Sequence, residues 1–222
     1  MTVISNPATI KTSSKVFWII IFSIAMAFVE SAVVVYLRAI YYPEGFSFPL
    51  HAITDNKLKV ELLRELATIF MLLSIAVITG RRLWERFAYF LFCFAIWDIF
   101  YYIWLKVLIN WPSTIFDWDI LFLIPLPWIG PVIAPVSISL LMIVIGLLII
   151  HSFYKGYDFK PLFLSVVLVL TGTGFILFSF MRDLDATLFQ RYPRPYLYEL
   201  LIIGELLYVA AFFISYRKAV RQ

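Results

Sequence analysis

Charged residues are scarce in this sequence of 222 residues: Asp, Glu, Lys and Arg make up 14% of it, whereas 63% is hydrophobic. Soluble globular domains contain about 25% charged and about 45–50% apolar residues, so the composition excludes that class. A basic patch interleaved with exposed aromatic residues, which is typical of nucleic-acid-binding surfaces, is also missing. The composition therefore predicts an integral membrane protein with no nucleic-acid partner.

Cysteine and histidine are almost absent, with one cysteine and two histidines in the chain. Cys93 lies in an apolar run and provides neither a disulfide framework nor a thiolate metal site. His51 and His151 fall on opposite sides of the membrane in the topology derived below, so they cannot share a haem or build a multi-histidine zinc or copper site. The paired Glu-x-x-His motif of di-iron bundles is missing too. We therefore predict no metal and no cofactor.

Motifs for nucleotide chemistry are missing as well. The chain has no Walker loop, no dinucleotide fingerprint and no Gly-x-Ser-x-Gly elbow. The chain is therefore not expected to hydrolyse ATP by itself, and any energy coupling would come from an ion gradient or a partner.

Long apolar runs dominate the sequence, and about 20 such residues let an α-helix cross ~30 Å of hydrocarbon. We expect an all-α integral membrane protein, a bundle of six transmembrane helices plus one short interfacial or re-entrant helix. These form a single domain over residues 16–216, between short tails at 1–15 and 217–222. The helices are expected at about 16–40, 54–79, 83–109, 131–151, 161–181 and 196–216.

The segment between the third and fourth helices, residues 113–124 (STIFDWDILFLI), is too short to span and is bounded by Pro112 and Pro125. We expect it to form the interfacial or re-entrant helix. The aromatic and acidic residues in and around it either dock a flat hydrophobic ligand or a lipid, or belong to an aromatic belt: Trp111, Asp117, Trp118, Asp119 and Trp128. Arg182, Arg191 and Arg194 either bind lipid phosphates or mark the membrane interface.

The distribution of loop charge predicts the orientation. With a cytoplasmic N-terminus, six helices place one set of basic residues on the inner side: Lys11, Lys15, Arg81, Arg82, Arg86, Lys155, Lys160, Arg217, Lys218 and Arg221. The opposite side then carries most of the acidic loop residues. Because positively charged loops stay cytoplasmic, we predict a multi-pass protein of the cell inner (plasma) membrane with both termini in the cytoplasm.

A set of carboxyl groups inside the predicted helices forms the candidate site: Glu30, Glu61, Glu65, Asp98 and Glu205. At 1.5 Å per residue, the acids on different helices come out roughly 12–16 Å from the outer helix ends, so they share one layer. A charge at this depth is costly and needs a partner. The candidate partners are Arg38, Arg64, Tyr101, Tyr102, Tyr198 and Tyr208.

Three interpretations of this acidic layer are open. The carboxyl groups accept hydrogen bonds and fix helix packing, or they hold protons or a cation, or they perform acid–base or hard-metal chemistry on a lipophilic substrate. We take the first as the prediction: a non-catalytic accessory or structural subunit of a membrane complex that binds partner helices and lipids. Other membrane-protein subunits or a homo-oligomer are the expected protein partners, because helices that are apolar all round suit a chain with several neighbours. The alternatives are a small ion- or proton-coupled transporter and an intramembrane enzyme.

One short stretch resembles a known family. The Trp97-Asp98 pair, followed by a Trp-Pro turn and an apolar segment, resembles the lycopene-cyclase-type membrane domain. The resemblance implies carboxylates that perform acid catalysis on a polyene. The Pro-x-Glu-Glu signature of that family is missing, since Pro127 is followed by Trp-Ile-Gly.

Overall fold

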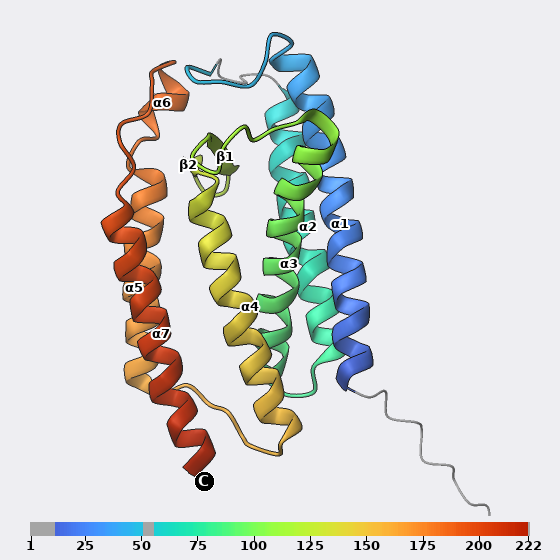
Figure 1. The fold of residues 1–222 in the computed structure, drawn as a ribbon, viewed down its shortest axis with the longest axis vertical. Helices are drawn as coiled ribbons and strands as arrows, with labels where there is room; N and C mark the ends of the chain where they lie inside the picture. Colours follow the sequence, from blue (N-terminus) through green and yellow to red (C-terminus); the bar gives the residue numbers. More distant parts are fainter. Residues whose placement is uncertain (1–11, 51–55, 222) are drawn as a thin grey trace, which may run out of the picture.

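Six long helices make up most of the computed structural model, which describes residues 12–50 and 56–221 (Figure 1). They are α1 (Thr12–Tyr41), α2 (Asn56–Thr79), α3 (Leu83–Ile109), α4 (Ile133–Tyr154), α5 (Phe163–Met181) and α7 (Tyr198–Arg221). Within the described residues, six helical segments are long and apolar enough to cross a membrane. The prediction of six long apolar helices, as a multi-pass membrane protein requires, is therefore confirmed.

The helices run alternately up and down, so the bundle has two ends (Figure 1). We call the end that carries residues 42–50, residues 110–132 and the short helix α6 (Asp185–Leu188) the hairpin end. The opposite end, where α1 begins and α7 ends, is called the tail end. Helix α3 packs against α1, α2 and α4, whereas α5 pairs with α7. The bundle thus consists of a group around α3 and an α5–α7 pair, in contact through α4 and the hairpin.

The segment between α3 and α4 corrects one expectation: part of residues 113–124 forms a strand instead of a helix. Strands β1 (Trp118–Phe122) and β2 (Trp128–Pro131) pair antiparallel, with Asp119 opposite Gly130. Pro112 and Pro125 confine any helix here to the 12 residues between them, because proline has no N–H to donate. A short isolated helix would also leave its end groups unpaired, whereas strand pairing satisfies the backbone within the hairpin.

The ends of the hairpin are fixed by local backbone contacts. Asn110 takes a left-handed conformation (φ 54°) and ends α3. The Asp117 carboxylate accepts the N–H groups of Ser113 (2.6 Å) and Thr114 (3.3 Å), which forms a tight turn before β1. The Val132 N–H then donates to the Asp117 carbonyl (3.0 Å). The hairpin therefore leads from the end of α3 directly into α4.

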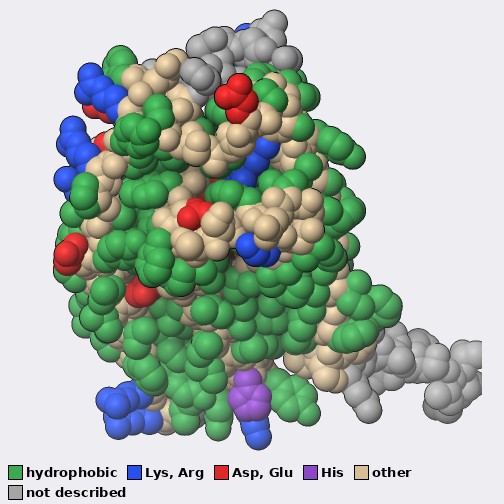
Figure 2. Space-filling view, turned by 45° about the horizontal axis from the view of Figure 1, so that its top comes forward, with side chains coloured by type: hydrophobic (Ala, Val, Ile, Leu, Met, Phe, Trp, Pro, Cys, Tyr) green, Lys and Arg blue, Asp and Glu red, His purple; other side chains and the backbone are tan. Residues whose placement is uncertain are grey.

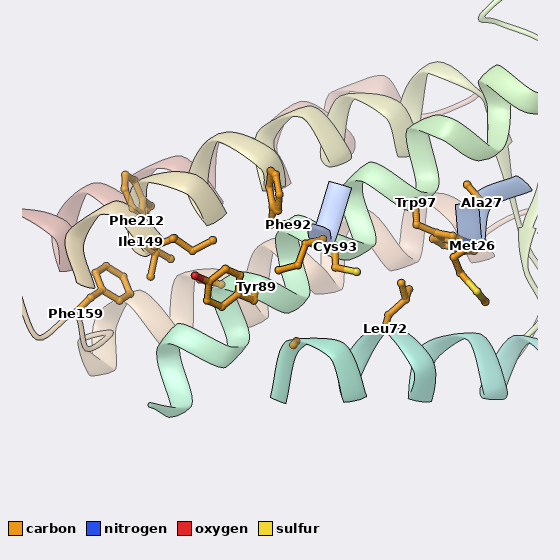
Figure 3. Packing of buried hydrophobic residues seen from close by; sticks show 14 of the residues in the cluster. Met26, Ala27, Leu72, Tyr89, Phe92, Cys93, Trp97, Ile149, Phe159 and Phe212 are labelled. Atoms are coloured by element: carbon orange, nitrogen blue, oxygen red, sulfur yellow. The ribbon is translucent and has the colours of Figure 1, made fainter. Parts of the chain in front are cut away.

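The buried core is centred on α3 (Figure 3). Tyr89, Phe92 and Cys93 are at most 2% exposed and pack against residues of α1, α2 and α4. The Cys93 Sγ lies 3.1 Å from the Ser23 hydroxyl of α1. A buried cysteine in this setting is a small apolar residue that fills the helix interface.

Helices α5 and α7 approach each other closely at two glycines. A Cβ atom added to Gly172 would lie 2.9 Å from the Gly204 carbonyl oxygen, and one added to Gly204 would lie 2.9 Å from the Gly172 oxygen. The Thr173 and Tyr208 hydroxyls also hydrogen-bond across this contact (2.8 Å). Small residues let membrane helices approach in this way, which explains the tight α5–α7 pair.

Candidate functional site

A cavity of about 210 Å³ lies at the hairpin end, between α1, α2, α3 and the hairpin. Its lining combines acidic, basic and aromatic side chains with apolar residues of the helices and of β1. Figure 2 looks onto this end of the molecule, where acidic and basic side chains show between hydrophobic ones. The flank of the bundle below them is almost wholly hydrophobic (Figure 2).

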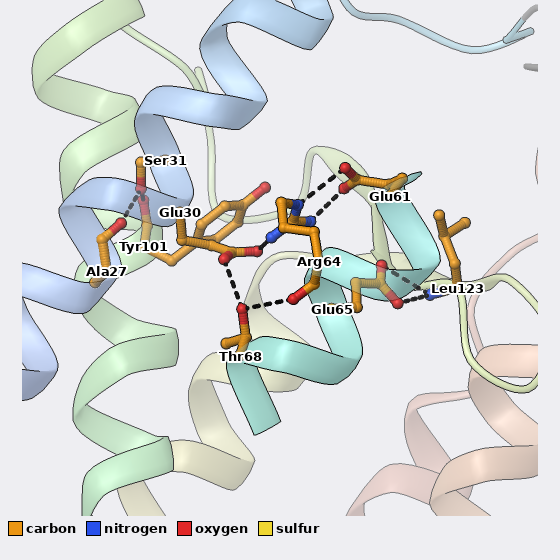
Figure 4. Close-up of polar contacts among 9 residues, drawn as sticks. All are labelled: Ala27, Glu30, Ser31, Glu61, Arg64, Glu65, Thr68, Tyr101 and Leu123. Carbon is orange, nitrogen blue, oxygen red and sulfur yellow. Dashed lines mark hydrogen bonds and ion pairs between the residues drawn. The ribbon is translucent and has the colours of Figure 1, made fainter. Parts of the chain in front are cut away.

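Arg64 of α2 is the centre of the first charged group (Figure 4). It forms ion pairs with Glu30 of α1 and with Glu61, one turn earlier in α2. Its Nε donates to a Glu61 carboxylate oxygen (2.9 Å). The Thr68 hydroxyl lies 3.1 Å from the Glu30 carboxylate and 3.1 Å from the Arg64 carbonyl. Helix α2 presents residues 61, 64, 65 and 68 on one face, because residues three or four positions apart on a helix point in similar directions.

Glu65 connects α2 to the hairpin (Figure 4). Its two carboxylate oxygens accept the backbone N–H of Leu123, directly after β1, at 3.1 and 3.0 Å. The residue is 5% exposed. It makes no ion pair with a described residue, so its carboxyl group is held by a neutral donor.

Arg38 and Asp119 form the second charged group, between α1 and β1. The Arg38 Nη2 donates to the Asp119 Oδ1 at 2.8 Å. The guanidinium lies between the rings of Phe46 and Trp111, 4.0 and 3.8 Å from their centroids. Burial raises the pKa of Asp119 to about 6, although Arg38 and the Ile120 N–H favour the charged form.

Asp98 of α3 also lines the cavity, and the Ser139 hydroxyl of α4 donates to its carboxylate at 2.8 Å. Like Glu65, it has no ion pair with any residue that the structure describes. Tyr101 and Tyr102 follow one turn later and line the same cavity, with ring centroids 5.0 Å apart. The structure therefore provides two kinds of carboxyl group here, those paired with arginine and those held by neutral donors.

Two buried donors at the cavity have neither a hydrogen-bond partner nor an ion-pair partner among the described residues: the Arg38 Nη1 and the Trp97 Nε1. Arg38 is 7% exposed and Trp97 is 6% exposed. A buried donor left without an acceptor costs about 1–3 kcal/mol, so an acceptor in the cavity would stabilise this arrangement. The cavity lining thus has both unmatched donors and unpaired carboxyl groups.

The structure brings together most, but not all, of the predicted site residues. The cavity is lined by Glu30, Glu61, Glu65, Asp98, Arg38, Arg64, Tyr101, Tyr102 and Asp119. Glu205 does not line it; this side chain lies on α7, and its buried Oε1 has no hydrogen-bond partner in the described part of the chain. Tyr208 bonds to α5 instead, and the Tyr198 ring packs against Tyr196.

The remaining predicted residues lie around the hairpin and α6. Trp118 packs edge-on against Tyr196, and Trp128 stacks on Phe180 of α5 with 6.2 Å between ring centroids. Arg194 pairs with Asp183 at 3.8 Å. Arg182 and Arg191 are exposed residues outside the cavity lining.

Some contacts of the site were missed by the sequence analysis. The sequence did not predict the contacts of the site with Ser139, with the Leu123 N–H or with Phe46. The Arg38–Asp119 pair joins residues 81 positions apart. Arg38 was predicted as a candidate partner of the acidic layer and Asp119 was assigned to the membrane interface, but their pairing was not predicted. Within residues 12–50 and 56–221, no group of three or more His, Cys, Asp and Glu residues is placed to hold a metal ion.

Comparisons with protein-family models, with curated proteins and with solved structures give no match. The resemblance to the lycopene-cyclase-type domain therefore gains no support from them. The geometry of the cavity itself is what any functional argument rests on.

Proposed function

We propose that the protein is a small proton-linked membrane carrier that binds an organic cation in the cavity at the hairpin end. The observation that carries this proposal is a charge imbalance: five carboxyl groups line the cavity, together with two guanidinium groups. Arg64 forms ion pairs with Glu30 and Glu61, and Arg38 forms one with Asp119. Glu65 and Asp98 form no ion pair with a described residue, so they can bind a proton or a cationic ligand.

The cost of burying carboxyl groups supports a functional over a purely structural role. An ionisable residue inside a membrane-spanning bundle is expensive, and such residues mark ion or proton pathways. Helix packing alone is served more cheaply by small residues, as at Gly172 and Gly204. A carboxyl group that holds either a proton or a cation exchanges one for the other, and this exchange links ligand binding to proton movement.

The other residues of the lining indicate the kind of cation. Val34, Leu37 and Leu58 give the cavity apolar walls, and Tyr101 and Tyr102 add aromatic surface. Ammonium groups bind well against aromatic rings with a carboxylate nearby. The unmatched donors of Arg38 and Trp97 suit an oxygen acceptor on the same molecule. An amine with a neighbouring oxygen acceptor and an apolar body fits these features together.

The test measures binding and proton release together. Isothermal titration of the purified protein with benzyltrimethylammonium, in buffers of different ionisation enthalpy, counts the protons released for each bound cation. We expect binding with proton release in the wild-type protein, and no binding of the neutral analogue benzyl alcohol.

Variants of the two unpaired carboxyl groups sharpen this test. Glu65→Gln and Asp98→Asn are expected to bind the cation at least about tenfold more weakly, because each variant removes a negative charge that attracts the ammonium group, and a unit charge pair 4 Å apart near a protein surface contributes up to about 4 kcal/mol. Glu205→Gln is the matched control, because it neutralises an intramembrane carboxyl group outside the cavity. Equal affinity in all three variants, or binding without proton release, would refute the proposal.

An accessory subunit of a membrane complex is the second candidate. The α5–α7 pair favours it, because α5 exposes Phe163 (85%) and Leu170 (66%) on its outer face. Lipid covers such a face as well as a partner helix does. Crosslinking from a cysteine introduced at Leu170, in native membranes, distinguishes them: a discrete crosslinked protein favours the subunit, and its absence favours a lipid-facing helix.

A further inference from the structure

A second concave site lies at the tail end, far from the charged cavity. The start of α1, the turn between α2 and α3, and the end of α4 surround an open groove of about 1250 Å³. Figure 1 shows these three segments at the end of the bundle opposite the hairpin. The groove shares no lining residue with the cavity.

The groove carries an excess of positive charge. Lys15, Arg81 and Arg82 line it, together with a single carboxyl group, that of Glu85. The Glu85 carboxylate accepts the backbone N–H groups of Arg81 (2.8 Å) and Arg82 (3.4 Å), at the start of α3. It therefore caps the helix and forms no ion pair with the basic side chains around it.

The three cations differ in how far they are already engaged. Arg82 pairs with Asp158 at 2.8 Å, outside the groove. The Lys15 Nζ donates to the Thr79 carbonyl at 2.8 Å, a neutral acceptor that leaves its charge uncompensated. The Arg81 guanidinium has no hydrogen bond or ion pair with any described residue. Lys15 and Arg81 thus remain available for an anion.

One wall of the groove is apolar and comes from α4. Leu147 and Leu148 are 38% and 37% exposed, and Tyr154, one helical turn beyond His151, is 69% exposed. Tyrosine at the end of a spanning helix is typical of the headgroup level of a bilayer, with the aliphatic residues of the same helix at acyl-chain depth. A molecule with an anionic head and a long apolar chain matches this order of charge and hydrophobicity.

We propose that this groove binds one anionic phospholipid of the leaflet at the tail end. Its phosphate lies at Arg81 and Lys15, and an acyl chain lies along Leu147 and Leu148 of α4. Basic pockets between spanning helices bind anionic lipid headgroups by the same combination of charge and apolar contact. This site is independent of the proposed carrier function.

Native mass spectrometry of the full chain tests the proposal, by titration with phosphatidylglycerol, with phosphatidylcholine of the same acyl chains, and with glycerol phosphate. We expect phosphatidylglycerol to bind with one-to-one stoichiometry and more tightly than the other two. Glycerol phosphate binding as tightly as the lipid would show a free phosphate site and overturn the lipid proposal. Equal affinity for both lipids would overturn the role of charge.

A charge variant locates the headgroup. Arg81→Gln is expected to weaken phosphatidylglycerol binding about fivefold, the effect of one basic residue at an anionic surface, and to leave phosphatidylcholine binding unchanged. Arg217→Gln is the control, because Arg217 is exposed in the last turns of α7 at the same end but does not line the groove. An equal loss in both variants would mean general surface attraction and would refute a defined site.

Discussion

Replacing Arg38 by methionine tests whether a buried ion pair fixes the hairpin to α1. The change leaves Asp119, which is 2% exposed, without its cationic partner. It also removes the guanidinium from between Phe46 and Trp111. Breaking a buried pair on one side costs about 3–5 kcal/mol, because the remaining charge is left uncompensated. We therefore expect Arg38→Met to lower the free energy of unfolding by about this amount.

A double-mutant cycle separates the pair from the rest of the site. Arg38→Met combined with Asp119→Leu removes both charges, and an apolar replacement of a buried pair is often neutral. We expect the double variant to be at least about 2 kcal/mol more stable than the sum of the single effects. Arg82→Met is the matched control: its pair with Asp158 is exposed, so we expect no measurable change. Unfolding in mixed micelles gives these values, and additive single effects would contradict the reasoning.

The penalty of Arg38→Met is also expected to depend on pH. The pKa of Asp119 is raised from 3.8 to about 6, so the folded protein binds this proton more tightly than the unfolded chain does. Its contribution to stability is therefore largest at low pH and declines as the pH rises through about 4 to 6. Without Arg38 the pKa rises further, because a charge that favours the carboxylate is gone. We expect the penalty to be largest above about pH 7 and to shrink at lower pH; a penalty independent of pH would argue against this origin.

Three further predictions concern other parts of the molecule. Gly172→Ala is expected to destabilise the protein by about 1–3 kcal/mol, because the added Cβ would meet the backbone of α7. Gly174→Ala is expected to be neutral, because no atom lies within 4 Å of the added Cβ, and thermal unfolding compares the two variants. Cys93 is 0% exposed, so we expect it to resist maleimide labelling in the folded protein and to react after denaturation. Labelling of the folded protein would contradict the packing around α3. Glu65→Ala is expected to speed hydrogen exchange at the Leu123 amide at least tenfold, because both acceptor oxygens are lost, and unchanged exchange would show that another group protects this amide.

The helices could be predicted from the sequence because membrane spans need only length and hydrophobicity. The run from Leu83 to Ile109 is bounded by arginines and by an Asn-Trp-Pro sequence, and α3 occupies the same residues. The hairpin could not be predicted in this way. Ile120, Leu121 and Phe122 suit a helix and a strand equally well, so the pairing with β2 decides between them.

Helical depth and spacing explain how far the site could be predicted. Glu30, Glu65 and Asp98 fall at similar depths on different helices, and the cavity collects all three. Depth does not say which helices are neighbours, so Glu205 was grouped with them although α7 pairs with α5. The Arg38–Asp119 pair depends on where the hairpin folds back, which no local pattern encodes.

The hairpin touches both parts of the bundle, and this has a mechanical consequence. On one side Glu65 and Arg38 hold β1 to α2 and α1. On the other side Trp128 of β2 stacks on Phe180 of α5, and Gly130 lies so close that a Cβ there would be 3.2 Å from the Phe180 ring. Because the same two-stranded hairpin contacts α1 and α2 on one side and α5 on the other, we expect a displacement of α1 or α2 to shift α5 as well.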